Sequence, residues 1–271
     1  MSQVPKRDRI QSPLALTLAI TTLTTSILTA ACQQQQTTSQ SNGTPTTAPS
    51  PATTPTTTST DGLKLGTLLP TTGDLSSIGQ NLPEAVKLAV DTVNACGGVN
   101  EKQVTVANQD DETDPAKGST AMTQLVDVDK VAGVVGSFAS SVSSAAVDIA
   151  VRNKVMLVSP GSTSPVFTER AKKGEFQGYW ARTAPPDTYQ AQALAALANK
   201  RGFKTASTVV INNDYGVGFE QEFVKAFEKL GGKLTDKDKP VRYDPKAATL
   251  DSEAAAAFGD KPDAVAAVLY T

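Results

Sequence analysis

The chain has 271 residues, with 25 Lys and Arg against 27 Asp and Glu, two cysteines and no histidine. A formal net charge of −2 provides no basic surface to neutralise phosphates, which argues against nucleic acid as a partner. Without histidine the chain cannot build a Ser-His-Asp or Cys-His catalytic group or a histidine-ligated metal site. The composition therefore excludes most hydrolase and zinc chemistry, and we expect neither a cofactor nor a metal.

The first 31 residues have the pattern of a bacterial secretory signal. Three basic residues among the first nine precede an uncharged stretch over residues 14–31. Seven of its 18 residues are Thr or Ser, and no stop-transfer cluster follows, so a membrane span is disfavoured. Small residues directly before Cys32 resemble a lipobox, in which the cysteine becomes the lipid-modified N-terminus, although Thr29 replaces the usual Leu. We expect a lipoprotein signal peptide over residues 1–31 and lipidation at Cys32. A plain secreted protein is the alternative.

Residues 32–60 are expected to form a disordered tether. They are rich in Thr, Ser, Pro and Gln and contain no charged residue. Such a segment buries too little apolar surface to offset its ordering entropy, so it should stay solvated, with mixed flexible and polyproline character. Together with a lipid on Cys32, this predicts a periplasmic or extracytoplasmic protein anchored to the membrane without spanning it.

From Leu63 onward, short β-rich runs alternate with segments of helical periodicity. The expected strands are residues 63–69, 104–108, 132–135, 155–158, 179–183, 205–211, 233–243 and 264–270. The expected helices are residues 82–93, 114–128, 141–152, 187–200, 216–230 and 249–258. This alternation predicts an α/β fold with parallel sheets. The prolines at 185 and 186 separate two series, which predicts one lobe over residues 61–182 and another over residues 183–271. A lobe that ends on a strand would lack a covering helix, so we expect the second lobe to be incomplete.

Hydroxyl-rich loops follow two successive strands. Ligands of open α/β sheets bind at the carboxyl ends of strands, so these loops are the places where a site is expected. The loop at 136–141 precedes a helix, whose N-terminal N–H groups and dipole favour an anion such as a carboxylate. The loop at 159–165 adds further hydroxyls. Alternatively, Ser140 and Thr163 are simply a helix cap and a turn residue, and spacing alone does not decide between these readings.

Three segments carry a resemblance to a known family. Residues 134–141, 155–165 and 213–216 resemble the branched-chain amino acid binding proteins of bacterial ABC importers, and the similarity runs in order from 63 to 271. The resemblance implies a type I periplasmic binding protein fold, in which two doubly wound parallel-sheet lobes close on the ligand. It implies an amino acid, neutral or branched-chain, as ligand and ABC permease subunits as partners of a monomeric protein.

The resemblance also implies roles for individual residues. Ser140, with Ser141 beside it, would hold the ligand α-carboxylate, and Thr163 would contact both the carboxylate and the ammonium. The Gly161 carbonyl would accept a hydrogen bond from the ammonium. The side-chain pocket would be formed by Phe138, Tyr215 and Ile78. The carboxylate that neutralises the ammonium in relatives is expected beyond Thr271.

Other interpretations remain open at this stage. The acidic residues 110–112 and 114 suit a hard cation, but acidic residues before a helix are expected from the helix dipole alone, and we predict no metal site. No nucleophile, acid or base has a suitable partner, so we predict no enzymatic activity. A sensor module on the same fold, binding amino acids, amides or urea, is the alternative to a transport protein.

Overall fold

The structure, a computed structural model, describes residues 62–270. The predicted signal peptide, Cys32 and the predicted tether lie outside the described residues and stay predictions. All described residues belong to a single compact unit of the chain. Among residues 62–270, no helix is both long enough and apolar enough to cross a membrane.

The first half of the described chain forms a five-stranded parallel sheet in the order β2-β1-β3-β4-β5. The strands are β1 (Lys64–Leu69), β2 (Thr105–Asp110), β3 (Gly133–Gly136), β4 (Met156–Ser159) and β5 (Trp180–Arg182). Each observed strand falls within about two residues of its predicted position. The alternation of strand and helix therefore identified the parallel sheet correctly.

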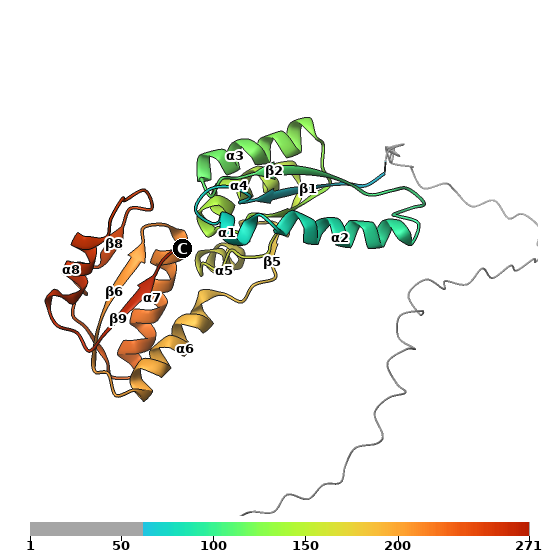
Figure 1. Cartoon of the computed structure of the whole chain (residues 1–271). Helices are drawn as coiled ribbons and strands as arrows, with labels where there is room; N and C mark the ends of the chain where they lie inside the picture. The colour runs from blue at the N-terminus through green and yellow to red at the C-terminus, as the bar shows by residue number, and fades with distance from the viewer. Residues whose placement is uncertain (1–61, 271) are drawn as a thin grey trace, which may run out of the picture. The chain divides into compact units, whose positions relative to one another are not determined.

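Helices cover both faces of this sheet (Figure 1). On one side runs α2 (Leu82–Ala95), while α3 (Pro115–Thr123), the π-helical turn η1 (Gln124–Val128) and α4 (Ser140–Asn153) lie on the other. The core on the α3 and α4 side contains Leu68, Met122, Leu125, Val134, Val147 and Leu157. Two short helices, α1 (Ser76–Gly79) and α5 (Val166–Lys172), occur in segments where the sequence predicts neither helix nor strand.

A second parallel sheet is built around β6 (Thr205–Ile211). On one edge β6 pairs with β7 (Lys233–Leu234) and β8 (Val241–Tyr243), and on the other with β9 (Ala264–Val268). One face is covered by α6 (Asp187–Lys200) and α7 (Asp214–Lys229), and the opposite face packs against α8 (Asp251–Gly259). The small side chains of α6, Ala191, Ala195 and Ala198, share a core with the α7 phenylalanines at 219, 223 and 227. Small residues on one helix thus make room for rings on the other.

The prediction of one strand over residues 233–243 is wrong. β7 pairs with the start of β6 and β8 with its end, so the chain leaves the sheet edge between them. Pro240 has no N–H to donate to a sheet ladder. The Asp236 carboxylate takes the place of the missing strand, because it accepts hydrogen bonds from the Thr208 N–H and hydroxyl at 2.8 Å each.

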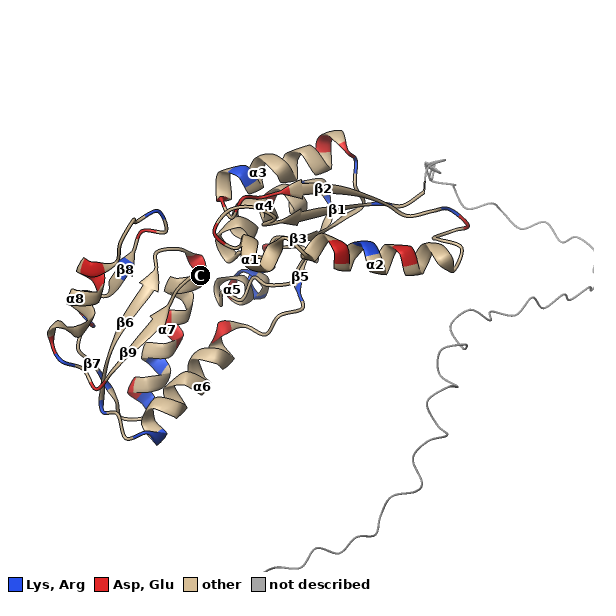
Figure 2. Ribbon diagram, in the orientation of Figure 1, with Lys and Arg blue, Asp and Glu red and all other residues tan. Residues whose placement is uncertain are grey.

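Charged residues of both signs are mixed over the two sheets and their helices (Figure 2). On α2, for example, Lys87 lies between Glu84 and Asp91 and forms an ion pair with Asp91 at 2.5 Å. This ion pair is exposed and contributes little to stability. Because charges of both signs are mixed, their distribution does not mark a functional site. The polar loops at the strand ends remain the places where a site is expected.

Candidate functional site

A cleft of about 270 Å³ lies where loops at the carboxyl ends of both sheets meet. Its walls come from the segments after β1, β3, β4, β6 and β9 and from α6. The lining residues are Leu75, Ile78, Phe138, Ala139, Ser140, Gly161, Thr163, Gln190, Tyr215, Leu269 and Tyr270. The structure therefore brings six of the seven predicted ligand-binding residues into one cleft. Ser141 is not among the residues that line it.

Ser140 is the first residue of α4, and its side chain is buried. Ala139 occupies the N-cap position and makes no side-chain cap, so the reading of Ser140 as a helix cap is wrong. The first helical hydrogen bond runs from the Ser143 N–H to the Ala139 carbonyl at 3.0 Å. The N–H groups of the first turn before Ser143 therefore have no acceptor within the helix and suit an anion. The Ser140 hydroxyl accepts the Ser164 N–H at 3.2 Å, which leaves its own proton for a ligand.

A buried network of serines fixes the two loops beside Ser140. The Ser137 carbonyl accepts hydrogen bonds from the hydroxyls of Ser143, Ser159 and Ser162 at 3.2, 2.6 and 3.1 Å. The Ser137 hydroxyl donates to Asp111 at 2.6 Å. Burial raises the pKa of Asp111, and the bond from Ser137 opposes that shift. In the 159–165 loop, the hydroxyls of Ser159 and Ser162 therefore fix the backbone at Ser137. Thr163, in the same loop, lines the cleft.

Gly161 allows the Phe138 ring to pack against the neighbouring loop. A Cβ atom at position 161 would lie only 2.6 Å from the ring, closer than real contacts allow. A side chain here would displace the ring from the cleft wall. The absence of a side chain at position 161 therefore has a direct steric reason, because it leaves room for the Phe138 ring.

Two tyrosines form another part of the cleft wall. Tyr215 lies in the first turn of α7, whose N-cap, Asn213, accepts the Tyr215 N–H at 3.1 Å. Its ring stacks on Tyr270 with centroids 5.9 Å apart and an interplanar angle of 14°. The Tyr270 hydroxyl accepts a hydrogen bond from the Asn213 amide at 3.2 Å. Burial raises the pKa of both phenols, so this wall stays neutral and presents largely apolar rings.

Sequence reasoning missed several residues around this cleft. Tyr270 and Leu269 follow β9, so the rule that ligands bind at strand ends would have identified them. Asp187 begins α6 and looks in the sequence like an ordinary acidic helix start. In the structure it is 0% exposed, and neither carboxylate oxygen accepts a hydrogen bond from the described residues. Burial raises its pKa to about 6, against the opposing influence of the Thr163 hydroxyl and Arg182.

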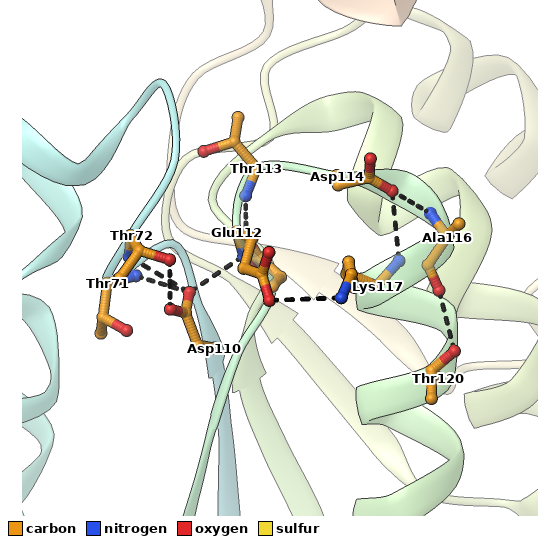
Figure 3. Close-up of polar contacts among 10 residues, drawn as sticks. Thr71, Thr72, Asp110, Glu112, Thr113, Asp114, Ala116, Lys117 and Thr120 are labelled. Carbon is orange, nitrogen blue, oxygen red and sulfur yellow. Dashed lines mark hydrogen bonds and ion pairs between the residues drawn. The ribbon is translucent and has the colours of Figure 1, made fainter.

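The acidic cluster before α3 has a structural explanation (Figure 3). Asp110 accepts hydrogen bonds from the Thr71 and Glu112 N–H groups and from the N–H and hydroxyl of Thr72. Burial favours its neutral form, but these bonds prevail and lower its pKa. Asp114 caps α3 by accepting the N–H groups of residues 116 and 117 at 2.8 and 3.2 Å. Within residues 62–270 there is no group of three side chains suited to a metal ion.

Comparison with known proteins agrees with this architecture. The family model described as "Receptor family ligand binding region" matches residues 81–264. The Leu/Ile/Val-binding protein homolog 2 of Brucella abortus is 32% identical over 181 residues, which are 64% of this chain and 45% of that protein. The chain thus spans about half the length of the curated relatives it matches.

Solved structures are similar over a larger part of the chain. The leucine-binding protein LivK of Thermotoga maritima has 28% identity and a TM-score of 0.65 over 76% of this chain and 55% of that one. LivJ of Streptococcus pneumoniae, solved with isoleucine, has 25% identity and a TM-score of 0.64 over 76% and 57%. A Rhodopseudomonas palustris solute-binding protein, solved with benzoate, has 25% identity and a TM-score of 0.66 over 77% and 55%.

The fold is thus that of the type I periplasmic binding proteins, as the resemblance predicted. The chain belongs to the family of the receptor ligand-binding region, whose model covers most of it. Its similar proteins are solute-binding proteins rather than enzymes.

Proposed function

We propose that this protein binds an amino acid, neutral or branched-chain, between two lobes and delivers it to an ABC permease. The lobes would comprise residues 61–182 and 183–271. The ligand would be held without chemical conversion. Relatives whose names or bound ligands point to leucine, isoleucine or valine support the ligand class, although a benzoate-binding relative has the same fold.

The observation that carries the proposal is the cleft itself. The N-terminus of α4 offers unpaired N–H groups and the Ser140 hydroxyl on one side, which suits an α-carboxylate. Thr163 and the Gly161 carbonyl lie on the adjacent loop, where an ammonium could donate to them. Phe138, Ile78 and the two stacked tyrosines leave an apolar space for a side chain. Ser141 would contribute its backbone N–H rather than its hydroxyl.

The proposal includes the location of the protein. A lipid on Cys32 and a tether over residues 32–60 would keep the binding lobes close to the outer face of the membrane, within reach of the permease. The protein would act there as a monomer. Metabolic labelling with palmitate, compared between the natural chain and Cys32→Ala, tests this part separately from ligand binding.

Isothermal titration of the full chain with a panel of amino acids tests the binding function. Ser140→Ala removes a hydroxyl expected to bond the carboxylate, so affinity for the bound amino acid should fall roughly 10- to 150-fold, as for a lost hydrogen bond to a charged group. Ser141→Ala is the matched control, because it removes the same group one residue away, outside the cleft lining, and should change affinity less than about threefold. Equal effects of both variants would contradict the assignment of the cleft.

A further inference from the structure

Five residues outside the cleft connect elements of the first sheet to helix α7 of the second. Ser144 on α4 donates its hydroxyl proton to the Asp214 carboxylate at the start of α7. Gly218, also on α7, abuts the loop after β4, where a Cβ atom on it would lie 2.8 Å from both Pro165 Cδ and Ser164 Oγ. We call Ser144, Ser164, Pro165, Asp214 and Gly218 the seam. None of these five residues is among those that line the cleft.

The hydrogen bond between Ser144 and Asp214 is not one that either helix needs for itself. Hydroxyls on helices commonly bond to the carbonyl four residues earlier, as that of Thr120 does at 3.0 Å. The Ser144 hydroxyl instead donates to the other helix. The N-terminus of α7 is already capped by the Asn213 side chain. The bond therefore serves the contact between α4 and α7.

Gly218 is also explained by this contact rather than by the backbone of α7. It lies inside the helix and its φ is not positive, so the backbone does not require glycine there. Glycine inside a helix is less favourable than alanine, because it loses more conformational freedom on folding. A side chain at position 218 would push α7 away from the loop after β4. The missing side chain therefore allows close packing between the two sets of elements although it weakens the helix.

The seam residues stand beside residues that line the cleft. Ser144 is one helical turn after Ser140 on α4, and Asp214 directly precedes Tyr215 on α7. The Ser164 N–H donates to the Ser140 hydroxyl at 3.2 Å. The seam thus determines where Tyr215 lies relative to the N-terminus of α4.

We propose that the seam is a latch that holds the cleft closed, and that it sets the affinity for a ligand through the fraction of closed protein. This inference rests on the proposed function. A ligand that contacts both sides of the cleft binds only where the two sides are together, so its apparent affinity falls in proportion to the closed fraction. Asp214 and Gly218 are then positioning residues, because they act through Tyr215 and do not touch the ligand.

Gly218→Ala separates a latch from a role in folding. Alanine favours the helical state of α7, but its methyl group would hold α7 away from the loop after β4. The full chain is titrated calorimetrically with L-leucine, L-isoleucine and L-valine. Affinity for the tightest of these should fall roughly 5- to 150-fold, as for overpacking of a close contact. The urea midpoint of the ligand-free chain should stay equal or rise.

Gly259→Ala is the matched control for Gly218→Ala. Position 259 lies at the end of α8, and a Cβ atom there would meet open space. This variant should change the affinity by less than about twofold.

The hydrogen bond of the seam is tested by a second set of variants. Ser144→Ala should lower the same affinity about 2- to 12-fold, as for one lost hydrogen bond. Asp214→Ala should lower it at least as much, whereas Asp214→Asn, which keeps an acceptor oxygen, should retain most of it. Ser144→Ala combined with Asp214→Ala should bind no more weakly than Asp214→Ala alone, because both changes remove the same bond. Ser119→Ala, on α3, controls for the loss of a hydroxyl and should have less than about a twofold effect.

Small-angle X-ray scattering of the full chain measures closure itself. At a saturating concentration of the tightest amino acid, Gly218→Ala should keep a larger radius of gyration than the natural chain. Gly259→Ala should match the natural chain. A role confined to the shape of the cleft wall would not produce this difference.

The outcomes separate the latch from the proposed function. If one of the three amino acids binds the natural chain and Gly218→Ala binds it equally well, the seam is not a latch. A weaker affinity of Gly218→Ala together with a lower urea midpoint, or with an unchanged radius of gyration at saturation, would also overturn the latch while amino acid binding stands. If the folded natural chain binds none of the three amino acids, both the proposed function and the latch are contradicted.

Discussion

Asp187 should cost the protein stability near neutral pH, because the burial of its carboxylate outweighs the opposing influence of the Thr163 hydroxyl and Arg182. Its pKa is about 6 in the folded protein against about 4 in an unfolded chain. The folded state therefore loses stability as pH rises from about 4 to about 6, and the loss is complete above that range. Asp187→Asn should raise the free energy of unfolding at pH 7.5 by about 1 to 2 kcal/mol, after allowance for solvent screening.

Urea unfolding of the ligand-free full chain at pH 4, 6 and 7.5 measures this effect. The difference between the natural chain and Asp187→Asn should be small at pH 4 and largest at pH 7.5. Asp127→Asn, which changes an exposed acid on η1, should show no comparable trend. A natural chain more stable than Asp187→Asn at pH 7.5 would mean that the carboxylate has a stabilising partner in the folded protein.

The residue scale also shows where sequence reasoning succeeds and fails. Ser140, Gly161 and Thr163 could be identified because they follow predicted strands, and that rule depends only on element order. Asp187 could not be identified as unusual, because an acid at a helix start is favoured by the dipole in any protein. It is buried next to distant segments such as the loop after β4, whose Thr163 hydroxyl interacts with its carboxylate, and such contacts leave no local pattern.

At the scale of elements, the edge of the second sheet offers a specific test. Asp236 satisfies the Thr208 N–H and hydroxyl where β7 and β8 leave a gap along β6. Asp236→Ala should lower the free energy of unfolding by about 1–3 kcal/mol, because it leaves a buried donor without an acceptor. Asp238→Ala, which removes the same charge from an exposed turn two residues away, should change stability by less than about 0.5 kcal/mol.

Equal urea midpoints for these two variants would show that water replaces the Asp236 carboxylate at the strand edge.

The same segment explains the largest error in predicting the elements. Residues 233–243 are interrupted by turn residues and Pro240, yet the flanking β-rich residues suggested continuity. Strands β1, β4 and β6, with their continuous runs of apolar residues, and helices α4 and α6, with regular periodicity, were predicted to within about two residues. The pattern of β-rich residues was least reliable between β7 and β8, where the Asp236 side chain, rather than a strand, bonds to β6.

At the scale of the whole described chain, the cleft depends on contacts between the two sheets' elements. The Ser144 hydroxyl on α4 donates to Asp214 on α7, and a Cβ at Gly218 would lie 2.8 Å from the Ser164 hydroxyl oxygen. Tyr215, on α7, and Phe138, in the loop after β3, both line the cleft. The sequence predicts two parallel-sheet units and, through the family resemblance, their closure on a ligand. It does not predict which side chains meet, because those contacts join residues more than 50 positions apart.

The most direct test of the central claim is a crystal structure of the full chain grown with the amino acid that binds most tightly in the titration panel. We predict that the ligand lies in the cleft, with its carboxylate within hydrogen-bond distance of the Ser140 hydroxyl and the first N–H groups of α4. Its ammonium should face Thr163 and the Gly161 carbonyl. An amino acid bound elsewhere on the protein, or lying in the cleft with its carboxylate turned away from α4, would contradict the account.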